Sequence, residues 1–599
     1  MLSIPVPSSL QEHLPLLLLL APLLAAAISL TGKLLPPAAT RLPAFIIWAA
    51  GTAGVLLLCA PDVFASASLT TAIGGWEEPY GIELELNGMS WTASLLGLII
   101  GAAVWRETCR ADKCFGRSSS TYPNTSPDTY TNRSTNMSAR RFGPGFYFFF
   151  YTAFLSLTGV LCTRDFFNLF VWFEILSLCS FVLIAYEQHL RSLLAAFRYL
   201  MVSTVSIMFY LLGLWLLYRY SGSLSISGAA SLLDSGVYKP ELGAALALLS
   251  AGILTRSAAV PFHSWLPEAH GAAPYPVSAL LSGLVIKAPV FALVHVLGDL
   301  SFPALRSLFI VLGIFGALLG AGGALVQRDI KFLLGYSSVS HMGLIIALFA
   351  SEDALAPSAM LFYIIAHGLA KSLLFLTLGG VSSSLQTRDL FALRGSLLRF
   401  PLHAAASLIG IATLVGMPFT AGYPAKLLAS KLIPYSPLLE VLLVIASVIS
   451  AAALLRLLLL FLPGRFLPGQ FFTGRELPGA AAVKNREASM KSASPGGPLF
   501  LAAACIAAGV IPQLLFPILT TLTAEAGTVA SHHQWYAAGS AGKSAAIIAA
   551  AALLAGTLFL PTGRIVSERV RELKSGLHGS LRLLVFGMFF FFLYGMLML

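Results

Sequence analysis

Residues 252–289, GILTRSAAVPFHSWLPEAHGAAPYPVSALLSGLVIKAP, place Arg256 and Lys287 inside two otherwise apolar segments, which a short connection rich in His, Trp and Pro separates. A Lys or Arg at the middle of a membrane helix costs about 2.5–3.5 kcal/mol on insertion scales. A charge kept at that depth usually faces a protein interior, where it handles ions or protons. This stretch therefore indicates both the fold class and the place where the function lies.

The composition of the whole chain is that of a helical membrane protein. Of its 599 residues, 57% are hydrophobic and only 11% are charged. Many apolar runs are about 20 residues long, the length that spans a bilayer as a helix. The net charge of +11 does not indicate nucleic-acid binding, because the basic residues lie in the connections between apolar runs. We expect an all-α polytopic membrane protein with about 14–16 transmembrane helices.

The predicted membrane helices are separated by connections of unequal charge. They cover residues 14–35, 43–60, 89–106, 146–162, 166–186, 195–218, 241–260, 274–297, 303–326, 331–349, 357–380, 402–431, 436–461, 498–519, 543–560 and 581–598. The connections after the third, ninth, eleventh and thirteenth helices are basic, and Arg328 and Lys331 supply the second of these clusters. Because cytoplasmic loops carry an excess of Lys and Arg, we expect loops after odd-numbered helices to be cytoplasmic in a multi-pass protein of the cell (inner) membrane.

Cofactor and metal sites are not indicated. The six cysteines contain no C-x-x-C pair, so the sequence supports neither a disulfide framework nor a zinc or iron–sulfur site. We find no nucleotide, flavin or haem motif either. We expect no cofactor and no metal in this chain, and we assign any redox chemistry to partner subunits.

Ionisable residues recur in later apolar segments. The full set is Glu174, Arg256, Lys287, His341, His367, Lys371 and Lys426. If the five charged members all faced lipid, the penalty would be roughly 12–17 kcal/mol, so they must face inward. His367 and Lys371 are four residues apart and share one helix face. A single such residue is often a structural ion pair or a snorkelling side chain, but a set of this size favours a proton or cation pathway.

Two predicted helices carry interruptions near these charges. Pro261 follows Arg256 by five residues, and Gly416 with Pro418 precedes Lys426. Each proline removes a helix hydrogen bond and frees a carbonyl at membrane depth. Broken helices beside midplane charges recur in transporters, although a simple packing kink is the alternative at either site.

These segments resemble the antiporter-like membrane subunits shared by Mrp-type sodium/proton antiporters, membrane-bound hydrogenases and respiratory complex I, the NADH:quinone oxidoreductase. The resemblance spans about residues 85–460. Its motifs are RDFFNLFVWFEILSLCSFVLIAY, AVPFHSWLPEAHGAAPYPVSALLSGLVIK, RDIKFLLGYSSVSHMGLI, HGLAKSLLFLTLGG and GMPFTAGYPAKLL. The segments DFFNLFVWFE and VSALLSG are most similar to the D-type Mrp subunit and its hydrogenase relatives.

The resemblance implies an architecture of two inverted five-helix repeats, each with one broken helix. The expected regions are N-terminal helices at 1–106, a polar, disordered cytoplasmic loop at 107–145, the repeats at 146–300 and 301–462, a polar loop at 463–497, and C-terminal helices with a short basic amphipathic connector at 498–599. It also implies roles for single residues. Glu174 matches the glutamate that modulates a neighbouring lysine, and Lys287 matches a proton-carrying lysine. His341, His367 and Lys371 match the central polar axis, and Lys426 matches the lysine of the second broken helix.

Position 256 departs from the family pattern. Where relatives have a lysine, in a pattern like T-K-x-x-x-V-P-x-H, this chain has Thr255-Arg256. Arginine stays protonated at any accessible pH, so Arg256 can pair with Glu174 but cannot release a proton. Two alternatives follow. Either translocation takes a shifted route through Lys287 and His263, or the chain is a structural membrane anchor with impaired translocation.

The leading hypothesis is a proton-translocating or cation/proton-exchanging membrane subunit of a multisubunit energy-converting complex. Such subunits are driven by partners, which we expect to be other membrane subunits and, in a redox-driven complex, peripheral redox subunits. Protonatable Lys and His outnumber carboxylates in the predicted path, which favours protons over Na⁺. Whether the complex is an enzyme, such as a hydrogenase or a quinone reductase, is left open by the sequence.

Overall fold

The computed structural model describes residues 11–76, 81–116, 142–234, 240–298, 303–433, 436–462 and 496–512, with a few positions between 515 and 551. Within these ranges, 11 helices are long and apolar enough to cross a membrane, and two shorter apolar helices accompany them. The expected all-α membrane fold is therefore confirmed. The predicted helices at 543–560 and 581–598 lie almost entirely outside the described residues.

The N-terminal part packs three helices around a small hairpin. Its elements are α2 (Leu14–Thr31), α3 (Pro37–Phe64), β1 (Leu69–Ala72), η1 (Ile73–Gly75), β2 (Glu83–Leu86) and α4 (Gly88–Gly116). The antiparallel hairpin, with Leu69 opposite Leu86, was not expected from the sequence. Helix α4 continues ten residues beyond its predicted end, and Glu107 lies fully buried there in an ion pair of 2.7 Å with Arg110. Residues 117–141 of the expected polar loop lie outside the described part of the chain.

Two sets of helices follow, joined by the connection between α12 and α13. The first set is α5 (Pro144–Cys162), α6 (Phe166–Ile184), η4 (Ala185–Glu187), α7 (Leu190–Ser221), α8 (Ile226–Asp234), α9 (Pro240–Arg256), α10 (Trp265–Ala272), α11 (Tyr275–Gly283), η5 (Val285–Lys287) and α12 (Ala288–Leu297). The second set is α13 (Pro303–Leu325), α14 (Ile330–Phe349), α15 (Ala356–Ser384), η6 (Ser396–Arg399), α16 (Pro401–Val415), α17 (Gly422–Leu432), α18 (Pro437–Leu455) and η7 (Arg456–Phe461), after which α20 (Gly496–Val510) follows.

The two sets repeat one local arrangement. Asp165 and Asp329 are the N-caps of α6 and α14, and each side chain accepts hydrogen bonds from main-chain N–H groups of the first turn. Each aspartate also forms an isolated antiparallel bridge, to Ser225 in the first set and to Asp389 in the second. Matching N-caps and bridges of this kind are expected of two structural repeats. The inverted orientation of one repeat relative to the other stays a prediction.

In the ranges that the structure describes, three interruptions divide predicted or apparent membrane helices. The first separates α9 from α10 and contains Pro261, and the second separates α16 from α17 and contains Gly416 and Pro418. Gly416 adopts a φ of 88°, a left-handed conformation that ends α16 and that glycine adopts without strain. The third break, between α11 and α12, was not predicted. It lies at Leu284, with φ −132° and ψ −56°, and places Lys287 at a turn rather than within a continuous helix.

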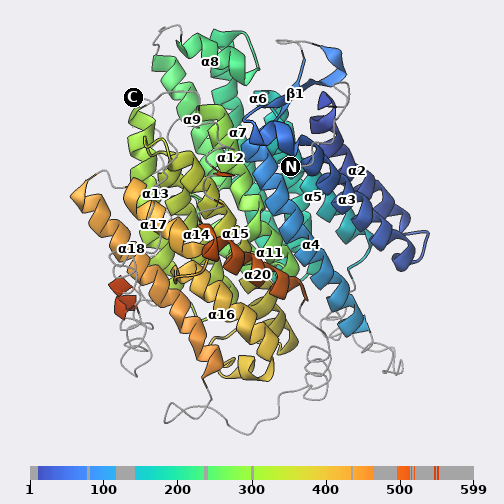
Figure 1. Ribbon diagram of the computed structural model, residues 1–599, viewed down its shortest axis with the longest axis vertical. Helices are drawn as coiled ribbons and strands as arrows, with labels where there is room; N and C mark the ends of the chain where they lie inside the picture. The colour runs from blue at the N-terminus through green and yellow to red at the C-terminus, as the bar shows by residue number, and fades with distance from the viewer. Residues whose placement is uncertain are drawn as a thin grey trace.

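The centre of the bundle is formed by α14 and α15, with α2 and α3 on one side and α18 on the other (Figure 1). In an apolar 18-residue stretch of α15, 94% is buried inside the protein. The corresponding value for α7 is 39%. A helix buried on all sides faces protein rather than lipid, so it can hold polar side chains at membrane depth. The fold thus places the ionisable residues of α14 and α15 in the protein interior.

Candidate functional site

The ion pair between Arg256 and Glu174 joins the end of α9 to the middle of α6. One terminal nitrogen of Arg256 donates to Glu174 Oε1 at 2.6 Å, and the other donates to the Phe173 carbonyl at 2.9 Å and to Ser177 Oγ. Arg256 Nε donates to Ser206 Oγ at 3.1 Å. Arg256 is only 8% exposed, whereas the Glu174 side chain is 45% exposed. The guanidinium is a buried and well-paired charge, and its carboxylate partner reaches the surface of the bundle.

Lys287 lies at the unpredicted break between α11 and α12. It is 1% exposed, and its Nζ donates to the Ser282 carbonyl in the last turn of α11. Carbonyls at the end of a helix lack main-chain partners and carry partial negative charge, so they favour an ammonium group. Within the described ranges, no carboxylate lies in ion-pair distance of Lys287. The helix break therefore supplies the partner that a carboxylate would otherwise provide.

Lys426 has the same kind of environment in the second set. It lies on α17, and its Nζ donates at 3.1 Å to the carbonyl of Val415, the last residue of α16. Gly416 comes so close that a Cβ there would lie 2.9 Å from Lys426 Cδ. The break between α16 and α17 thus provides both the acceptor and the space for this lysine.

Lys371 and two histidines lie between these breaks. Lys371 is fully buried on α15 and donates to the Leu334 carbonyl of α14 at 2.9 Å. The rings of His341 and His367 are 5.0 Å apart, and His341 Nδ1 lies 2.8 Å from the Tyr363 hydroxyl. A cavity of about 10 Å³, near the minimum for one water molecule, is lined by both histidines and by Lys426.

His263 is placed differently from the rest of the predicted set. It lies in the connection between α9 and α10 rather than on a helix and is partly buried, as Lys426 is, whereas Lys287, Lys371 and the other two histidines are buried. The structure therefore buries Lys287, His341, His367 and Lys371 within α11 to α15. The partly buried Lys426 of α17 lines the same small cavity as the two histidines, while His263 lies in the connection before α10.

Comparisons with known proteins give the family to which this chain is similar. The family model described as "NADH:quinone oxidoreductase/Mrp antiporter, TM" matches residues 163–450. NADH-quinone oxidoreductase subunit N of Desulforudis audaxviator (strain MP104C) is 31% identical over 432 residues, which cover 69% of this chain and 79% of that protein. The chain belongs to this family of antiporter-like membrane subunits.

Two further matches come from other branches of the antiporter-like family. Hydrogenase-4 component B of Escherichia coli (strain K12) is 32% identical over 293 residues, 46% of this chain and 43% of that protein. A chain of the Mrp complex from Dietzia sp. DQ12-45-1b superposes with a TM-score of 0.69 at 20% identity, covering 90% of this chain and all of that one. At this identity, the structural match shows the fold alone. The resemblance predicted from the sequence motifs is confirmed.

Several buried ionisable residues of this antiporter-like subunit were not assigned to the site from the sequence, and two of them lie on α10 and α14. Lys331 was counted with the basic connection before the predicted helix 331–349. It lies in the first turn of α14, is 4% exposed and donates to the Ala273 carbonyl at 2.6 Å. His270 on α10 is fully buried, with its ring 4.7 Å from that of Phe375. The signal for Lys331 was available, because Asp329 is a helix N-cap and places the lysine inside the helix.

Arg388 extends this group of cations into the connection after α15. Its guanidinium donates to the Gly271 carbonyl, beside the Ala273 carbonyl that Lys331 contacts. Burial lowers the pKa of Arg388, an effect that the nearby Asp329 carboxylate opposes. The end of α10 thus binds two cations through its terminal carbonyls, as the helix dipole favours.

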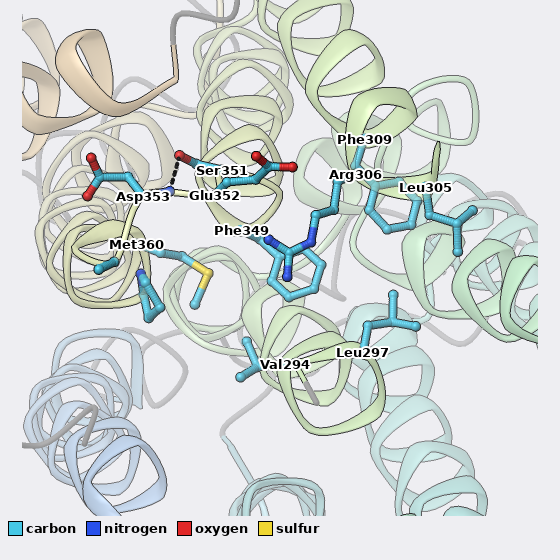
Figure 2. Close-up of a pocket in the computed structure, with 13 residues that line it drawn as sticks. Val294, Leu297, Leu305, Arg306, Phe309, Phe349, Ser351, Glu352, Asp353 and Met360 are labelled. Carbon is cyan, nitrogen blue, oxygen red and sulfur yellow. Dashed lines mark hydrogen bonds between the residues drawn. The ribbon is translucent and has the colours of Figure 1, made fainter. Parts of the chain in front are cut away.

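A second cavity, of about 250 Å³, opens where α12 and α14 end and α13 and α15 begin. Its lining includes Arg306, Glu352 and Asp353 but none of the predicted pathway residues. In Figure 2 the side chains of Arg306 and Glu352 extend into the same opening, whereas the Asp353 carboxylate points away from it. This cavity is a polar recess separate from the buried lysines.

Proposed function

We propose that this chain is a proton-translocating subunit of a multisubunit membrane complex. The observation that carries this proposal is a set of three lysines, the buried Lys287 and Lys371 and the partly buried Lys426, each of which donates to a main-chain carbonyl. No ion pair joins any of them to a carboxylate in the described part of the chain. A buried lysine without a fixed counter-ion can alternate between charged and neutral forms, which proton transfer requires.

Arg256 serves in this proposal as a fixed positive charge. Its four acceptors hold the guanidinium in place, and arginine does not release a proton in proteins. Translocation in the first repeat then begins at Lys287, with His263 as the group nearest the surface. Protons are the favoured ion because the path consists of Lys and His side chains, and Na⁺ exchange is the alternative for the same residues.

The partners in this proposal are other membrane subunits, in a cell membrane with the loops after odd-numbered helices on the cytoplasmic side. The half-exposed carboxylate of Glu174 supports a partner at α6, because a charged group facing lipid at this depth is expensive. Phe167, Val171 and Leu178 on the same helix are also exposed, so the surface around the carboxylate is apolar. A neighbouring membrane subunit would cover this surface. Peripheral redox subunits would join it in a redox-driven complex.

A structural membrane anchor is the second candidate, and Arg256 is the observation that favours it. The test is proton uptake by vesicles that contain the reconstituted complex, with Lys287→Ala, Lys371→Ala and Lys426→Ala compared with Lys33→Ala, an exposed lysine after α2. A translocating subunit loses uptake in the Lys287, Lys371 and Lys426 variants and keeps it in the control. An anchor keeps uptake in all four, provided that the complex assembles equally well.

A further inference from the structure

A hydroxyl pair joins α11 to α14 between two of the buried lysines. Ser282 Oγ and Ser338 Oγ are 2.9 Å apart, and either oxygen can be the donor. Both serines are fully buried, and they are 56 residues apart in the sequence. A serine hydroxyl donates one hydrogen bond and accepts others, so the pair can reverse its direction by rotating two hydroxyl groups.

Each serine lies next to a hydrogen bond made by one lysine. On the α11 side, Lys287 Nζ donates to the main-chain carbonyl of Ser282, the residue whose hydroxyl forms the pair. On the α14 side, the Leu334 carbonyl accepts from Lys371 Nζ at 2.9 Å and from Ser338 Oγ at 3.1 Å. Lys371 Nζ and Ser338 Oγ therefore lie around the same oxygen atom. The hydroxyl pair thus lies between the acceptor of Lys287, the Ser282 carbonyl, and the acceptor of Lys371, the Leu334 carbonyl.

We propose that the Ser282–Ser338 hydroxyl pair passes protons between Lys287 and Lys371. The inference rests on the proposed function and specifies the route within it. Lys287 breaks one N–H bond and gives that proton to Ser282 Oγ, while Ser282 gives its own hydroxyl proton to Ser338 Oγ. Ser338 then gives its hydroxyl proton to the neutral amine of Lys371. Both serines end as neutral hydroxyls, and one positive charge has moved from η5 to α15.

The step requires each lysine to change its hydrogen-bond acceptor. Lys287 Nζ must turn from the carbonyl of Ser282 to the hydroxyl of the same residue, and Lys371 Nζ must turn from the Leu334 carbonyl to the adjacent hydroxyl. The two hydroxyls then rotate back before the next transfer. A competing route would pass through His367, which lies one turn before Lys371 on α15.

The test uses the intact complex in vesicles, with proton uptake measured for Ser282→Ala, Ser338→Ala and the double variant. Because the hydroxyls act in series, each single variant should lose at least about tenfold in rate, and the double variant should lose no more than the worse single variant. Ser340→Ala is the matched control. Ser340 also lies buried on α14, but its hydroxyl donates to the Ala317 carbonyl of α13 at 2.9 Å.

A second pair of variants separates the hydroxyl from its packing. Ser338→Thr keeps the hydroxyl and Ser338→Val removes it, while the two side chains have nearly the same shape. The proposal predicts faster uptake in the threonine variant, and a larger slowing in deuterated water for wild type than for the valine variant. Equal rates for Thr and Val, or full uptake in both alanine variants while Lys371→Ala is inactive, would overturn the relay and leave the proposed function intact. Full uptake in Lys371→Ala would overturn both.

Discussion

Replacement of Arg256 by lysine would introduce the residue that the family resemblance implies at this position, and it would remove the guanidinium, all three of whose nitrogens donate hydrogen bonds in this structure. The guanidinium donates to four acceptors: Glu174 Oε1, the Phe173 carbonyl, Ser177 Oγ and Ser206 Oγ. An ammonium has three N–H groups on a single nitrogen, so at least one acceptor loses its partner. One lost hydrogen bond to a charged group corresponds to about 1.5–3 kcal/mol. We expect Arg256→Lys to destabilise the subunit by about that amount.

The same variant should leave proton uptake within about twofold of wild type, since the account assigns position 256 a fixed positive charge and the adjacent Glu174 carboxylate keeps a lysine there protonated. Stability is measured by equilibrium unfolding in mixed micelles, and uptake in reconstituted vesicles. Arg198→Lys is the control, because Arg198 pairs with Glu268 at the surface, where both side chains are a third or more exposed and the pair contributes at most about 1 kcal/mol. A several-fold rise in uptake for Arg256→Lys, together with unchanged uptake for Lys287→Ala, would refute the shifted route.

Three further predictions concern other parts of the site. Gly416→Ala should destabilise the subunit by about 1–2 kcal/mol, because position 416 has a φ of 88°. It should also slow proton uptake, because the added Cβ would contact Lys426. An unchanged free energy of unfolding and unchanged uptake would contradict this prediction. Glu174→Gln should cost about 1 kcal/mol or less in unfolding free energy, since its side chain is 45% exposed, yet reduce uptake several-fold by leaving Arg256 without a counter-charge. Lys331→Met should cost about 1.5–3 kcal/mol in the same unfolding assay by removing the hydrogen bond to Ala273, and a cost near zero would argue against it.

The fold class followed from the sequence because hydropathy and helix length are local properties. Apolar runs of about 20 residues predict membrane helices, and Pro261, Gly416 and Pro418 lie in the breaks that the structure contains. The break at Leu284 could not be predicted in the same way. The segment around it is apolar and the nearest proline, Pro289, follows the break, so its position depends on tertiary packing.

The buried site was partly predictable for the same physical reason. A lysine in a long apolar run is conspicuous, which is why Lys287, Lys371 and Lys426 were identified from the sequence. Lys331 was missed because it stands beside loop residues in the sequence, and its burial arises only from the packing of α10 against the first turn of α14. The Ser282–Ser338 contact depends on the approach of two distant segments, and nothing local in either segment indicates it.

The central claim is that this subunit moves protons through buried lysines. The most direct measurement is proton uptake by vesicles with the reconstituted complex, comparing Lys371→Ala with Lys33→Ala at equal amounts of assembled complex. Lys371 is fully buried, whereas Lys33 is exposed. The account predicts that uptake is lost in Lys371→Ala and unchanged in Lys33→Ala. Equal uptake in both variants would contradict it.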